Sequence, residues 1–135
     1  MQLVDTNILA YLLIEGDRNA QAAAILKYDP DWHSEHFVLV EFTNVLLTCL
    51  RAQALTMSQA NDTLDKAKAV FKTNLRTMDH SSVLRIAHEY GVSAYDARYL
   101  AMALELDVPL ITEDKRLRRT APKLTQSMDE VLKRF

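Results

Sequence analysis

Four acidic residues stand where a carboxylate could do chemistry: Asp5, Glu41, Asp96 and Asp114. Magnesium and manganese prefer hard oxygen ligands, and magnesium is commonly held by one or two carboxylates, with water and substrate phosphate filling the other positions. If the four acids converged, they would repel one another and raise the pKa of at least one carboxyl group, and a divalent cation would relieve this. This chemistry predicts a metal site that acts on a phosphate-bearing substrate.

Two of the acids follow short apolar segments that we interpret as strands. Asp5 comes directly after 2–4, and Asp114 follows 108–111 after only two polar residues. In an open α/β sheet, ligands bind beyond the carboxyl ends of the strands. We therefore expect these two carboxylates at the same edge of the sheet.

Glu41 interrupts an apolar run, and a carboxylate in such surroundings is costly to bury without a cation or hydrogen-bond donors. The run at 36–51 contains many β-forming residues, but its length and its polar spacing of three and four predict a helix. An alternative stays open, in which Glu41, Asn44, Thr48 and Arg51 form the solvent-facing stripe of a helix that packs on the core.

The other acids also have purely structural alternatives. Ser93 and Asp96 are spaced as in a capping box, and an acid in the first turn favours the helix dipole. Asp5 could equally be only a helix cap, and Asp114 only a turn residue. Taken singly, each of these acids could have either a structural role or a role in metal binding.

The remaining pattern predicts short strands separated by helices, and therefore an α/β fold with a parallel sheet covered by helices on both faces. At 135 residues the chain fits one domain, 1–135. The expected helices begin at Asn7 and span about 18–27, 36–51, 56–73, from Asp79 or Ser81 to Gly91, and 93–106; the expected strands are 2–4, 75–78 and 108–111.

The net charge of -2 and the pI near 6.1 argue against a simple basic nucleic-acid-binding surface. Positive charge is instead concentrated in 115–123, directly after Glu113 and Asp114, which suits a polyanionic substrate but also an ordinary solvated surface. No targeting segment or membrane-length apolar run is found, and the single Cys49 cannot form an internal disulfide. We expect a cytoplasmic protein.

Four motifs in order make the chain resemble the PIN-domain nuclease family, in particular the single-domain VapC-type toxins of toxin-antitoxin pairs. The resemblance extends over nearly the whole chain. The motifs are Val4-Asp5-Thr6-Asn7-Ile8-Leu9, Val40-Glu41-Phe42-Thr43-Asn44-Val45-Leu46, Ser93-Ala94-Tyr95-Asp96-Ala97 and Leu110-Ile111-Thr112-Glu113-Asp114-Lys115-Arg116-Leu117.

The resemblance implies a Rossmann-like, three-layer PIN domain with a short central parallel sheet. It also implies that the four acids are both the metal ligands and the catalytic residues of a Mg²⁺- or Mn²⁺-dependent endoribonuclease, with a cognate antitoxin and a homodimer as expected partners. Supporting polar residues would be Thr6, Asn7 and Thr112, together with the extra acid Glu113, which could join the metal shell or point to solvent.

Beside the acids, Arg98, Lys115 and Arg116 are candidates for holding the RNA backbone, and Tyr95 could stack on a base or pack beside its helix. Two rival functions stay open. One is a non-catalytic RNA-binding or scaffold domain of the same fold, and the other is a phosphatase-like or receiver-like domain that uses Asp5 as nucleophile or phosphate acceptor.

Overall fold

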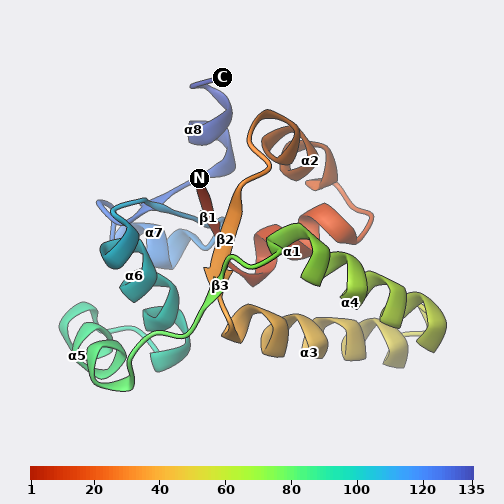
Figure 1. The fold of residues 1–135 in the computed structure, drawn as a ribbon, viewed down its shortest axis with the longest axis horizontal. Coiled ribbons are helices and arrows are strands. Elements are labelled where there is room, and N and C mark those ends of the chain that lie inside the picture. Colours follow the sequence, from red (N-terminus) through yellow and green to blue (C-terminus); the bar gives the residue numbers. More distant parts are fainter.

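The computed structural model describes all residues, 1–135, and its centre is a five-stranded parallel sheet (Figure 1). The strand order is β3-β2-β1-β4-β5. The strands are β1 (Gln2–Val4), β2 (Trp32–Glu35), β3 (Leu75–Arg76), β4 (Leu110–Ile111) and β5 (Thr125–Gln126). The predicted α/β architecture is confirmed.

The two strands that precede Asp5 and Asp114, β1 and β4, are neighbours in the inner part of this sheet. Val4 of β1 pairs with Ile111 of β4 in parallel register, so the chain leaves both strands at the same edge. Leu3 and Val4 are adjacent and face opposite sides of the sheet, and neither has exposed surface, as expected of a strand covered by helices on both faces. The expected convergence of Asp5 and Asp114 follows from this register.

Helices cover both faces of the sheet. In Figure 1, α1, α3 and α4 lie on one side, and α5 and α6 on the other. The helices are α1 (Thr6–Leu13), α2 (Asn19–Tyr28), α3 (Phe37–Arg51), α4 (Met57–Phe71), α5 (His80–Tyr90), α6 (Ala94–Leu106), α7 (Lys115–Thr120) and α8 (Met128–Leu132). Their apolar faces and the strands form one cluster of 28 buried hydrophobic residues. None of the helices is both long enough and apolar enough to span a bilayer.

The predicted helix boundaries coincide with real caps. Thr56 and Gln59 form a reciprocal capping box at the start of α4, and the Asp79 carboxylate accepts the Ser82 N–H at the start of α5. Gly91 ends α5 with a φ of 65°, a conformation that glycine adopts without steric cost. These local signals were sufficient to place α4 and α5 along the chain.

Strand β2 was not predicted, because three of its four residues are polar. The structure satisfies those side chains through tertiary contacts: the Ser34 hydroxyl donates to the Val4 carbonyl at 2.7 Å, and Glu35 binds backbone N–H groups and an arginine. The short elements β5, α7 and α8 were also missed.

Candidate active site

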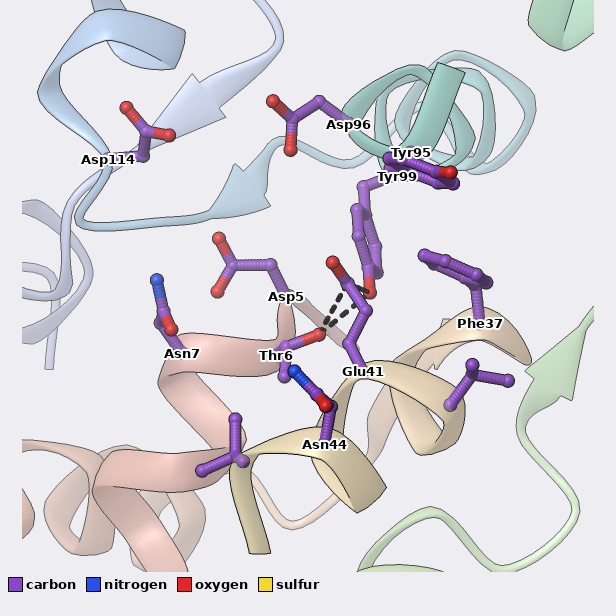
Figure 2. A pocket seen from close by; sticks show the side chains of 12 residues that line it. Asp5, Thr6, Asn7, Phe37, Glu41, Asn44, Tyr95, Asp96, Tyr99 and Asp114 are labelled. Carbon is purple, nitrogen blue, oxygen red and sulfur yellow. Dashed lines mark hydrogen bonds between the residues drawn. The ribbon is translucent and has the colours of Figure 1, made fainter. Parts of the chain in front are cut away.

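A pocket of about 410 Å³ opens where β1 and β4 end, and α1, α3 and α6 line it together with the start of α7 (Figure 2). The four predicted acids all line this pocket, and so do Thr6 and Asn7. The twelve lining residues are Asp5, Thr6, Asn7, Phe37, Val40, Glu41, Asn44, Val45, Tyr95, Asp96, Tyr99 and Asp114.

Asp5 is the most buried of the four acids, with 8% of its surface exposed. It caps α1, and its carboxylate accepts the Ile8 N–H at 3.2 Å. Burial raises the pKa of Asp5 to about 6, and the negative charges of Glu41 and Asp96 add to the rise, whereas hydrogen bonds from Thr112 and the Ile8 backbone oppose it. Asp5 therefore caps α1 and also presents a carboxylate with a raised pKa to the pocket.

Asp96 and Asp114 also combine a place at a helix start with a place in the pocket. The Ser93 hydroxyl accepts the Asp96 N–H at 3.0 Å, but Asp96 does not return a hydrogen bond to the Ser93 backbone, so the capping box is not closed. Partial burial raises the pKa of Asp96, and the charges of Asp114 and Glu41 raise it further. Asp114 caps α7 by accepting the Leu117 N–H at 3.1 Å.

Two hydroxyl groups fix the orientation of Glu41. Thr6 Oγ1 donates to Glu41 Oε1 at 2.7 Å, the Tyr99 hydroxyl donates to the same oxygen, and the two hydroxyl oxygens lie 2.9 Å apart (Figure 2). Burial, and then the hydrogen bond to Glu41, raise the pKa of Tyr99, so its hydroxyl stays protonated and available as a donor. Glu41 therefore does not belong to a purely solvent-facing stripe, although Thr48 further along α3 is exposed.

Tyr99 is a site residue that the sequence reasoning missed. It lies three residues after Asp96 in α6, and residues at this spacing share a helix face. That spacing was the available signal, but a tyrosine among apolar residues is ordinarily interpreted as core. The structure places it in both roles, because its ring is buried and its hydroxyl reaches the pocket.

Thr112 and Glu113 occupy the segment between β4 and α7, and neither lines the pocket. Thr112 is fully buried behind the site, where its hydroxyl accepts the Asp114 N–H at 3.1 Å and its polarity lowers the pKa of Asp5. Glu113 forms an ion pair of 3.0 Å with Arg18, and only 9% of its side chain is exposed. In this structure Glu113 does not line the pocket, and its ion pair connects this segment to the chain before α2.

The structure gives Arg98 a partner within the protein. Its guanidinium binds Glu35 at 3.0 Å, and Glu35 is 1% exposed and also accepts the N–H groups of Phe37 and Met78. Arg98 thus ties α6, which carries Asp96, to the end of β2 and the start of α3. A contact of Arg98 with RNA would compete with this pair.

Lys115 and Arg116 are both exposed in the first turn of α7. Arg116 lines a smaller cavity of about 120 Å³ together with Asp96 and Asp114, and its positive charge lowers the pKa of Asp96. Lys115 lies instead in a polar groove of about 440 Å³ that includes other basic residues of α7. Arg116 is therefore the nearer of the two to the acids.

The donor set suits a hard divalent cation. The acids present carboxylate oxygens to one pocket, and burial together with their mutual charge raises the pKa of two of them, Asp5 and Asp96. No group of three or more His, Cys, Asp or Glu side chains is arranged to hold an ion by itself. An ion bound through one or two carboxylates, with water completing its shell, fits this arrangement.

Known proteins share both the sequence pattern and the fold. Residues 3–123 match the PIN domain family. Ribonuclease VapC3 from Pyrobaculum aerophilum is 28% identical over 126 residues, which are 90% of this chain and 95% of that protein. The crystal structure of PAE2754 from the same organism has a TM-score of 0.75 at 25% identity and covers 98% of this chain and 93% of its own. A toxin-antitoxin complex from Klebsiella pneumoniae includes a chain of similar fold, with a TM-score of 0.63 at 19% identity, and the match covers 93% of this chain and 97% of that one. This protein belongs to the PIN domain family.

Proposed function

We propose that this protein is a metal-dependent endoribonuclease that hydrolyses RNA phosphodiester bonds and acts as the toxin of a type II toxin-antitoxin pair. The observation that carries the proposal is that Asp5, Glu41, Asp96 and Asp114 come from separate parts of the chain and line one pocket at the carboxyl edge of the sheet. Membership of the PIN domain family and the resemblance to a relative named as a ribonuclease support it.

In this proposal the acids hold Mg²⁺ or Mn²⁺ and orient water toward the phosphodiester. Thr6 and Tyr99 occupy one oxygen of Glu41, which leaves its Oε2 for the pocket. Asp5 and Asp96 supply buried or half-buried negative charge that favours cation binding. When bound, the cation would supply charge neutralisation at the phosphate and activation of water.

The RNA backbone would approach from the side of α7. Arg116 lies beside Asp96 and Asp114, and Lys115 is exposed next to it in an adjoining groove, so we expect both to contact phosphates of the bound strand. Arg98 acts in this proposal as a positioning residue, because its ion pair with Glu35 fixes the helix that carries Asp96.

The biological setting is part of the same proposal. We expect a cognate antitoxin that covers the active-site pocket, a homodimeric toxin and a cytoplasmic location. The toxin-antitoxin complex among the structural neighbours supports the first of these by similarity of fold. Copurification of the tagged chain from its native host, followed by mass determination of the complex, tests the two partners together.

Cleavage of a labelled RNA pool tests the catalytic proposal. The purified protein is assayed with Mg²⁺ or Mn²⁺, with chelator, and as the Asp5→Asn and Asp96→Asn variants, whose folding is checked by circular dichroism. Asp79→Asn is the matched control, because Asp79 also caps a helix but lies outside the pocket. Cutting that requires the metal, disappears in both site variants and persists in the control supports the nuclease. Cutting that survives chelator or both site variants refutes it.

A direct binding measurement separates metal loading from catalysis. Titration of Mn²⁺ into the native protein, monitored by calorimetry, should show binding that Asp96→Asn weakens and Asp79→Asn does not. A native protein that binds Mn²⁺ but cuts no RNA would favour the non-catalytic RNA-binding domain.

A further inference from the structure

The pocket has a second wall that the metal chemistry does not need. Phe37 and Val40 of α3 and Tyr95 of α6 line it, and Val40 and Tyr95 keep 61% and 60% of their surface exposed. In Figure 2 the rings of Phe37 and Tyr95 lie on the right of the pocket, and Asp5 and Asp114 lie on the left. We name Phe37, Val40 and Tyr95 the aromatic wall.

A chain of contacts that begins at a buried glutamate holds the aromatic wall in place. The Tyr95 ring stacks on the Phe37 ring with centroids 5.2 Å apart and an interplanar angle of 3°. The Arg98 guanidinium lies 5.2 Å from the centroid of the same Phe37 ring, and the buried Glu35 holds Arg98 in place. An exposed tyrosine that is ordered in this way offers a flat apolar surface at little entropic cost to a ligand.

The wall stands on the same two helices as two of the acids. Tyr95 precedes Asp96 directly in α6, and Phe37 lies one helical turn before Glu41 in α3. Asn44 lines the pocket one turn further along α3, and its side-chain amide makes no hydrogen bond within the protein. An amide offers both a donor and an acceptor, which matches the edge of a nucleobase.

We infer that the aromatic wall is a stacking site for an unpaired nucleobase of the RNA strand, adjacent to the phosphodiester that the acids receive. The inference rests on the proposed function, because the same strand supplies the base and the phosphate. Stacking on an aromatic ring requires a base that is free of its helix, and any base has a suitable face. The site therefore selects single-stranded RNA, and Asn44 contacts the edge of the stacked base.

Binding of uncut RNA tests this inference without relying on cleavage. All proteins in this experiment carry Asp114→Asn, so that the RNA is not cut, and the protein with this change alone is the background variant. Fluorescence anisotropy in Mg²⁺ compares their affinity for a short unstructured RNA with their affinity for the same ribose-phosphate strand without its bases, the abasic strand. We expect Tyr95→Ala to weaken binding of the intact strand about tenfold, a typical effect of removing one base–aromatic stack. The abasic strand should bind both proteins equally, and Tyr95→Phe should bind as the background does.

Tyr28 provides a matched control. Its side chain is also 60% exposed and stacks on a phenylalanine, Phe135, with ring centroids 5.1 Å apart, but it lies outside the pocket. Tyr28→Ala should leave the affinity for both strands unchanged. Thermal unfolding of both alanine variants shows whether either change disturbs the fold.

The possible outcomes are distinct. Equal weakening of both strands by Tyr95→Ala, or no weakening, overturns the inference; no weakening together with loss of a copurified protein partner would assign the wall to that partner instead. Base-dependent binding by the background variant, together with a native protein that cuts no RNA in Mg²⁺ or Mn²⁺, supports the stacking site and refutes the nuclease. A protein that binds neither strand refutes both.

Discussion

Replacement of Asp5 by asparagine should stabilise the cation-free protein in a pH-dependent way. Asparagine is as good a helix cap as aspartate, so α1 keeps the hydrogen bond from the Ile8 N–H. The substitution removes a buried carboxylate whose pKa is raised from 3.8 to about 6 by burial and by neighbouring acids. That difference corresponds to about 3 kcal/mol, which is the largest gain that Asp5→Asn can give.

The sign of the effect follows from proton binding. Between about pH 4 and pH 6, the folded native protein retains a proton on Asp5 that the unfolded chain has already released. Raising the pH through this window therefore lowers the free energy of unfolding of the native protein, and the decrease is complete above the folded pKa. Asp5→Asn has no such decrease, so its advantage is near zero at pH 4 and largest above pH 7.

Urea unfolding in chelator, monitored by circular dichroism from pH 4 to pH 8, measures this difference. Asp79→Asn is the control, because Asp79 caps α5 through the same kind of hydrogen bond at an exposed position. Added Mn²⁺ should reverse the order at pH 7, since a ligand stabilises the form that binds it better. An advantage of Asp5→Asn that is absent at pH 8, or that is the same at every pH, would refute the assigned electrostatics.

Three further results are expected. Arg98→Ala should lower the free energy of unfolding, measured in urea, by about 3 kcal/mol, because it leaves the buried Glu35 without its cation. Arg76→Ala removes an exposed ion pair and should lower it by less than about 1 kcal/mol. Equal effects of the two variants would contradict a stabilising role of the buried pair. Tyr99→Phe should lower kcat/KM about tenfold because a hydrogen bond to a carboxylate is removed, and an unchanged kcat/KM would show that the hydroxyl does not act in the site. Replacing Lys115 or Arg116 by alanine should flatten the slope of log K against log salt by about 0.7 for each phosphate that the variant no longer neutralises, and an unchanged slope would exclude that residue from the interface.

The sequence by itself determined most of the elements and the acids that follow them. Asp5 and Asp114 could be placed at one edge of the sheet because each comes at or shortly after the end of an apolar strand, and parallel strands share the edge at which they end. The helix starts at Thr56, Asp79 and Ser93 were equally predictable, since capping depends on residues only three positions apart. Because these signals depend only on residues close in the sequence, they can be recognised without knowledge of the fold.

Only the tertiary structure decided which polar groups meet. Glu41 and Tyr99 are 58 positions apart, and Arg98 and Glu35 are 63 apart, so no periodicity connects them. The short strand β2 could not be predicted for the same reason. Its buried polar side chains are stable in the core only because groups distant in the sequence form hydrogen bonds with them. A basic residue beside a candidate metal-binding acid can bind substrate or stabilise the fold, and for Arg98 the outcome depends on a buried carboxylate at the end of β2 that only the fold brings to it.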